Sequence, residues 1–155
     1  MAGRISSLLD PARIELAVQA TERTAALLEV AQLFAGHPAL TDFDGFYADL
    51  LARDRLDTTN LGNGIAVPHA RTEFVNRIVL AVGRSGVGIP FDGGESVHLM
   101  FMLGTPLSDP GDYLRVLGAL CKILKAPAHR AAMLAAPTPA DFIAVVAEAE
   151  VQLAL

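Results

Sequence analysis

The segment Val97-His98-Leu99-Met100-Phe101-Met102-Leu103 contains seven residues, of which only His98 is polar. Seven residues make a strand of ordinary length, whereas a membrane-spanning helix needs about 20 apolar residues. Apolar side chains at successive positions, instead of at every second position, are typical of a strand that is covered on both faces of its sheet. The segment therefore predicts a central strand with helices on both sides of the sheet.

Three further segments have the character of strands or of their connections. Residues 77–83 are rich in β-forming side chains, and residues 64–70 form a shorter apolar run. The glycines and proline of residues 86–94 predict a turn-rich connection between residues 77–83 and the central strand. Residues 13–18 alternate at first between polar and apolar side chains, which predicts one more short strand.

Helical patterns flank this β-rich middle on both sides. Before it, one helix is expected to open at Thr21 and a second to be capped by Thr41. After it, apolar side chains line one helical face over residues 113–124, and Thr138-Pro139 begins another helix. This order of elements predicts an α/β fold, a single-domain sandwich whose mixed four- to five-stranded sheet is flanked by helices.

Composition restricts the class of protein. The 155 residues fit one domain, residues 1–155, and 52% of them are apolar, which is enough for a buried core. The net charge of -5 gives no electrostatic reason to bind nucleic acid or an anionic membrane. Cys121 is the single cysteine, and its apolar helical pattern predicts a core position. Since no run resembles a signal peptide or a membrane helix, we expect a cytoplasmic protein without membrane insertion.

Residues suited to phosphoryl chemistry gather in Thr59-Asn60-Leu61-Gly62-Asn63-Gly64-Ile65-Ala66-Val67-Pro68-His69-Ala70-Arg71, with Arg53 upstream. Neutral imidazole is a nucleophile near pH 7, so His69 can attack phosphorus. Thr59 offers a hydroxyl donor, Gly62 permits close approach of the backbone, and the two flanking arginines can pair with phosphoryl oxygens. Arg53, Thr59, Gly62 and Arg71 are therefore the candidate phosphoryl-binding residues.

These residues alone leave a structural role for His69 open, because a lone histidine is more often structural or exposed than functional. Other kinds of site lack their motifs. No Gly-Lys-Ser/Thr follows the glycines, which excludes a P-loop, and the nucleophile elbow of serine hydrolases is missing. No second histidine lies at metal-ligand spacing from His69, so we expect neither a metal site nor a cofactor.

The segment from Leu61 to Arg71 closely resembles the active-site segment of the fructose- and mannitol-type enzyme IIA domains of the phosphoenolpyruvate-dependent sugar phosphotransferase system. That group includes the nitrogen-regulatory IIA protein, and its pattern is Gly-x-Gly, small apolar residues and Pro-His. The resemblance implies that His69 accepts a phosphoryl group from the histidine-containing phosphocarrier protein HPr or from its nitrogen-related counterpart. It also implies that Arg53, in the pair Arg53-Asp54, helps to bind that group. The likeness covers roughly residues 13–149.

Two positions depart from the family pattern. Tyr113 stands where the family usually has a second histidine, which lies near the first and supports phosphoryl transfer. Its hydroxyl can donate a hydrogen bond, but its ordinary pKa of about 10 makes it a poor proton shuttle at pH 7. Asn60 replaces a usual glycine, and asparagine tolerates the left-handed backbone. We expect Tyr113 to point at His69 from the facing helix and Arg53 to lie within reach of His69.

Three functions are compatible with this resemblance. The expected one is regulation, in which phosphorylation of His69 changes the affinity for a regulated partner, because no IIB or membrane domain is attached. The second is a sugar-specific IIA that passes the phosphoryl group to a IIB domain. The third is an adaptor that never receives phosphate because Tyr113 replaces the second histidine. In the first two, the chain acts as a phosphotransferase that carries a phosphoryl group on histidine.

Overall fold

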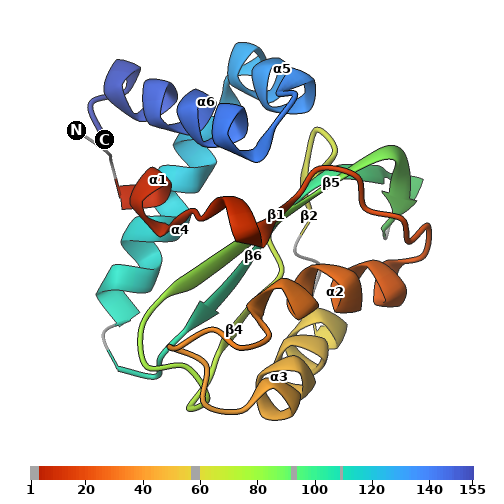
Figure 1. Cartoon of the computed structure of the whole chain (residues 1–155), viewed down its shortest axis with the longest axis vertical. Helices are drawn as coiled ribbons and strands as arrows, with labels where there is room; N and C mark the ends of the chain where they lie inside the picture. The colour runs from red at the N-terminus through yellow and green to blue at the C-terminus, as the bar shows by residue number, and fades with distance from the viewer. Residues whose placement is uncertain (1–3, 57–59, 92–93, 109) are drawn as a thin grey trace.

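The two longest strands, β5 (Val79–Pro90) and β6 (Ser96–Thr105), pair at the centre of the sheet (Figure 1). The computed structural model describes residues 4–56, 60–91, 94–108 and 110–155. Within these residues the sheet has six strands in the order β1-β5-β6-β3-β2, and β4 also pairs with β6. The shorter strands are β1 (Ile14–Glu15), β2 (Asn60–Gly62), β3 (Ile65–Ala66) and β4 (His69–Arg71).

The sheet is mixed, as the sequence predicts. β1 runs parallel to β5, and β3 and β4 run parallel to β6, whereas β5–β6 and β2–β3 are antiparallel pairs. The described sheet exceeds the expected four or five strands because the apolar run at residues 64–70 is divided. Pro68 has no N–H for a ladder bond and separates β3 from β4, although both pair with β6.

The predicted turn at residues 86–94 is wrong in its first half, because β5 continues to Pro90. The register against β6 shifts within this stretch and then resumes, with Pro90 opposite Ser96. Gly88 has a φ of 97°, which favours glycine, and its N–H donates to Ser85 Oγ at 2.9 Å. These glycines therefore form an irregularity inside the strand and not the connection that ends it.

Helices cover both faces of the sheet (Figure 1). One layer contains α1 (Arg4–Leu8), α4 (Pro110–Lys125), α5 (Pro127–Ala135) and α6 (Pro139–Gln152). The other contains α2 (Arg23–Ala31) and α3 (Phe43–Leu56). A short 3-10 turn follows α1 at Pro11–Arg13, and another follows α2 at Gln32–Phe34. None of the helices in the described part of the chain is long and apolar enough to cross a membrane.

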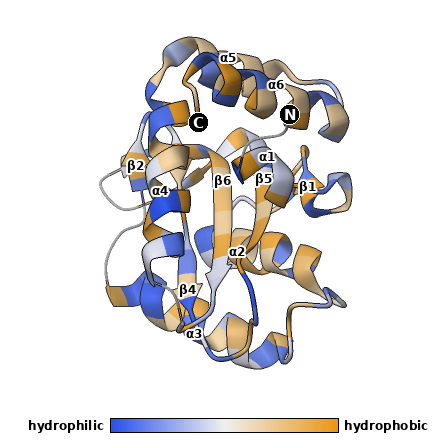
Figure 2. Ribbon diagram, turned by 90° about the vertical axis from the view of Figure 1, so that its left-hand side faces the viewer, coloured by the Kyte–Doolittle hydropathy of each residue, from blue (hydrophilic) through white to orange (hydrophobic). Residues whose placement is uncertain are grey.

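Side chains of β6 enter the two hydrophobic cores alternately. Leu99, Phe101 and Leu103 pack toward α4 and α6, in the first core. Met100 and Met102 pack toward α2 and α3, in the second. Figure 2 shows β5 and β6 as hydrophobic strands between these helical layers. The prediction of a central strand covered on both faces is confirmed, and the α/β fold class with it.

Candidate functional site

His69 is the first residue of β4, and β6 is the one described strand with which β4 pairs. Side chains alternate along a strand, so the buried Ala70 points into the second core while His69 and Arg71 point the other way. His69 opens on a pocket of about 260 Å³ lined by Asp49, Arg53, His69, Ala70, Arg71 and Tyr113. The pocket thus lies where α3, β4 and the N-terminal part of α4 meet.

Two hydrogen bonds determine the tautomer of His69. Nδ1 lies 2.9 Å from the carbonyl oxygen of Val67. A carbonyl oxygen only accepts, so Nδ1 carries the hydrogen of the neutral ring. Nε2 then has a free lone pair, and the hydroxyl of Tyr113 donates to it at 3.1 Å. The lone pair of His69 therefore lies on Nε2, and the predicted contact between Tyr113 and His69 is present.

The surroundings of His69 favour the neutral ring. Burial is the largest cause of a pKa below the ordinary 6.5, because the charged imidazolium loses its water shell. The hydrogen bond to Val67 acts in the opposite direction, and the positive charge of Arg53 lowers the pKa further. His69 is consequently favoured as a neutral imidazole beside a cation.

Arg53 lies in the same pocket as His69, as expected, and one of its hydrogen-bond donors has no partner among the described residues. Its Nη1 is buried, and no described residue accepts a hydrogen bond from it. The next residue, Asp54, faces α2, where its two oxygens accept hydrogen bonds from Arg23 at 3.0 Å each. Arg23 also stacks over the ring of Phe91, 4.4 Å from its centroid. This cluster anchors the last turn of α3 through the residue next to Arg53.

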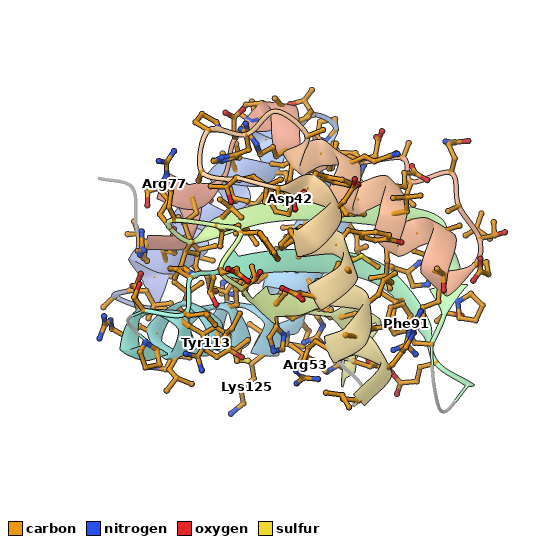
Figure 3. All side chains as sticks on the ribbon, turned by 90° about the horizontal axis from the view of Figure 1, so that it is seen from below. Asp42, Arg53, Arg77, Phe91, Tyr113 and Lys125 are labelled. Atoms are coloured by element: carbon orange, nitrogen blue, oxygen red, sulfur yellow. The ribbon has the colours of Figure 1, made fainter. Side chains whose placement is uncertain are left out.

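Figure 3 shows Arg53 on the C-terminal half of α3 and Tyr113 on α4, the two helices that flank the pocket. The two residues are 60 positions apart in the numbering and meet only through the fold. Arg71, the second arginine predicted for the site, also lines the pocket, and its Nη2 donates to the carbonyl of Leu107 at 3.1 Å. The structure therefore brings together His69, Arg53, Tyr113 and Arg71.

One predicted phosphoryl-binding residue, Gly62, is not part of this arrangement. Gly62 lines a different pocket, with Cys121 and Lys125, because the left-handed backbone of residues 62–64 turns β2 back into β3 away from β4. Thr59 lies outside the described residues. Cys121 itself is exposed, so its predicted core position is wrong: it lies on the solvent side of α4.

Sequence reasoning missed one residue of the pocket, Asp49. It precedes Arg53 by four positions on α3, so the two side chains share a helix face. That spacing was visible in the sequence, but nothing local indicated which face of α3 turns toward His69. Among the described residues, no group of three or more histidine, cysteine, aspartate or glutamate side chains is arranged to hold a metal ion.

Comparisons with known proteins agree with this fold and indicate one family. Residues 7–149 match the family model described as Phosphoenolpyruvate-dependent sugar phosphotransferase system, EIIA 2. The Nitrogen regulatory protein of Pseudomonas aeruginosa is 28% identical over 149 residues, which cover 95% of this chain and 97% of that protein. The PTS system fructose-like EIIA component of Escherichia coli is 29% identical over 111 residues, 70% of this chain and 75% of that protein.

A solved structure supports the same assignment. The crystal structure of Nitrogen Regulatory Protein IIA-Ntr from Neisseria meningitidis superposes with a TM-score of 0.86 at 25% identity, covering 93% of this chain and 99% of that one. The family model spans His69, Arg53 and Tyr113, and the fold agrees as well. The chain therefore belongs to the EIIA 2 family of the phosphoenolpyruvate-dependent sugar phosphotransferase system.

Proposed function

We propose that this chain is a phosphocarrier of the phosphotransferase system that accepts a phosphoryl group on Nε2 of His69 and signals its phosphorylation state to partner proteins. The donor is HPr or its nitrogen-related counterpart. One observation carries the proposal: the lone pair of Nε2 opens on a pocket that also contains a buried nitrogen of Arg53, to which no described residue is hydrogen-bonded. A neutral nucleophile beside an unused cationic donor suits an incoming phosphoryl group.

The transfer step needs one new bond and one broken bond. Nε2 of His69 forms the N–P bond with its lone pair, while the P–N bond to the donor histidine breaks and leaves its electron pair on the donor nitrogen. The hydrogen on Nδ1 stays bound to that nitrogen throughout, and Nδ1 keeps donating it to the carbonyl oxygen of Val67. Arg53, and Arg71 beside it, offset the negative charge of the phosphoryl oxygens. The step requires no metal and no cofactor.

Tyr113 has a defined part in this proposal. Its hydroxyl occupies the lone pair of Nε2 before transfer, so it keeps the ring oriented and moves aside when phosphorus approaches. After transfer, the same hydroxyl can donate to a phosphoryl oxygen. The contact therefore supports phosphate acceptance over the adaptor function. If an imidazole at this position speeds transfer, Tyr113→His will raise the rate of phosphorylation by HPr.

A regulatory role is preferred to sugar transport. The Pseudomonas relative named Nitrogen regulatory protein is matched over 97% of its length, and the IIA-Ntr structure over 99% of its own. The alternative, a sugar-specific IIA that donates to a IIB domain, is supported by the name of the fructose-like relative. Both functions place the chain in the cytoplasm with HPr. Incubation of the phosphorylated chain with a fructose-type IIB domain discriminates between them, because only the alternative predicts rapid loss of the phosphoryl group.

The decisive experiment is phosphorylation in solution. The chain is incubated with phosphoenolpyruvate, enzyme I and HPr, and its intact mass is measured before and after mild acid. We expect one acid-labile phosphoryl group in the unsubstituted protein and none in His69→Ala. His98→Ala is the matched control, since His98 lies on β6 outside the pocket and should leave phosphorylation unchanged. A phosphoryl group that persists in His69→Ala, or none in the unsubstituted protein, overturns the proposal.

A further inference from the structure

We propose that Asp49 raises the phosphoryl-transfer potential of phosphorylated His69, by holding a carboxylate in the pocket that receives the phosphoryl group. The inference rests on the proposed function and assigns a role to the one ionisable residue lining the pocket that the proposed transfer step does not use. Asp49 lies one helical turn before Arg53 on α3 and lines the pocket with Arg53, His69 and Tyr113. A negative side chain is unexpected in a pocket built for an anion.

A buried hydroxyl holds the Asp49 carboxylate in place. Thr72 is 2% exposed, and its Oγ1 donates to Asp49 Oδ2 at 2.7 Å. The same Oγ1 accepts a hydrogen bond from the backbone N–H of Phe74 at 3.2 Å, so its own hydrogen is left for Asp49. The backbone N–H of Thr72 donates to the carbonyl of Thr105 at 2.8 Å, which ties this residue to the end of β6. Asp49 is therefore anchored to the sheet as well as to α3.

This anchor keeps Asp49 apart from the nearest cation of its own helix. Opposite charges four residues apart on a helix usually attract, and an acid that precedes a base is the favoured order. Nevertheless, no ion pair joins Asp49 to Arg53 among the described residues, and Nη1 of Arg53 lacks a partner. Both charges are thus held separately at the wall of one small pocket, and a phosphoryl group on Nε2 would enter between α3 and α4 facing both.

The two charges act on the phosphorylated state in opposite senses. A phosphoryl group carries a charge of about -1.5 to -2 at pH 7, so Arg53 attracts it and the Asp49 carboxylate repels it. Unphosphorylated His69 is neutral and feels much less of this repulsion. The carboxylate therefore raises the energy of the phosphorylated form selectively. When the Nε2–P bond breaks and the electron pair returns to Nε2, the repulsion is released, which favours donation to the next acceptor.

Asp49→Asn tests this role, because asparagine keeps an oxygen that can accept from Thr72 and removes the charge. The measurement is the equilibrium constant for phosphoryl exchange with HPr, from the phosphorylated fractions of both proteins by intact mass. We expect Asp49→Asn to shift this constant about tenfold toward the phosphorylated chain at low salt, and less at high salt, where charge repulsion is screened. Asp44→Asn, which removes an exposed charge from the first turn of the same helix, should change it less than twofold.

An unchanged constant in Asp49→Asn, or a shift toward the unphosphorylated chain, overturns the inference. A shift that does not respond to salt also overturns it, because that result indicates altered packing and not charge. A second donor, phosphoramidate, separates this failure from that of the proposed function. If His69 of the unsubstituted chain is phosphorylated by neither HPr nor phosphoramidate, the proposed function and the role of Asp49 both fail. If His69 is phosphorylated, and the unsubstituted chain and Asp49→Asn have the same equilibrium constant for exchange with HPr, only the role of Asp49 fails.

Discussion

Replacing Arg53 by methionine separates phosphoryl binding from stability. Nη1 of Arg53 is buried without a partner among the described residues, so the native fold gains no hydrogen bond from this nitrogen. Methionine keeps an unbranched side chain on α3 while it removes the charge and the donors. We therefore expect Arg53→Met to slow phosphorylation of His69 and to leave the fold intact.

The two expected effects differ in sign and size. A buried polar group without a partner destabilises a protein by about 1–3 kcal/mol. Because the Arg53 side chain as a whole is only half-buried, its removal should raise the free energy of unfolding by at most about 1 kcal/mol. Loss of one preorganised donor from a transition state typically raises the barrier by about 2.7–4 kcal/mol. The rate of phosphorylation should therefore fall about a hundredfold or more, since tenfold corresponds to about 1.4 kcal/mol.

Two measurements on the same protein test this expectation. Single-turnover phosphorylation by purified phospho-HPr, followed by intact mass, gives the rate, and urea denaturation gives the free energy of unfolding. Arg55→Met is the matched control, because Arg55 is exposed in the same last turn of α3 and should affect neither quantity. A rate for Arg53→Met within about threefold of the unsubstituted rate, or a loss of stability above about 2 kcal/mol, would refute the reasoning.

Three further predictions follow from the hydrogen bonds and burial. Tyr113→Phe should raise the pKa of His69, because it removes the hydroxyl donor that stabilises the neutral form at Nε2. An NMR titration of the imidazole in which this pKa falls or stays constant would contradict the prediction. The pKa values of His69 and His37 are both lowered from 6.5, chiefly by burial, so below that pH the unfolded chain binds protons that the native protein does not. The free energy of unfolding should therefore decrease as the pH falls from about 7.5 to about 5.5, and urea denaturation of His69→Gln should show a smaller decrease. Glu150→Ala should lower the free energy of unfolding by about 3 kcal/mol, because the buried carboxylate accepts hydrogen bonds from the N–H groups of Ile5 and Ser6. If urea denaturation shows a loss below about 1 kcal/mol, or hydrogen exchange at these two amides is unchanged, these bonds contribute little to stability.

Local sequence patterns predicted the fold where one element carried a consistent signal. The apolar run at residues 97–103 became β6, covered on both faces, and Thr138 caps α6, with its Oγ1 accepting from the N–H of Asp141. Predictions failed where a partner elsewhere decided the conformation. Thr41, expected to cap α3, instead donates its hydroxyl to the carbonyl of Phe74. The glycines of residues 86–94 looked like a turn because pairing with β6, which keeps β5 extended to Pro90, is a long-range contact.

The sequence by itself determined the candidate nucleophile, His69, and the family of the chain. Gly-x-Gly and Pro-His lie within one short segment that closely resembles one kind of active site. It also indicated Arg53 and Tyr113 by their places in that resemblance. Only the tertiary structure decided which imidazole nitrogen is free, because that depends on the Val67 carbonyl and the Tyr113 hydroxyl converging on one ring. The same holds for Asp49 and Gly62: which face of α3 meets β4, and which way β2 turns, are results of packing between distant segments, and no local pattern encodes them.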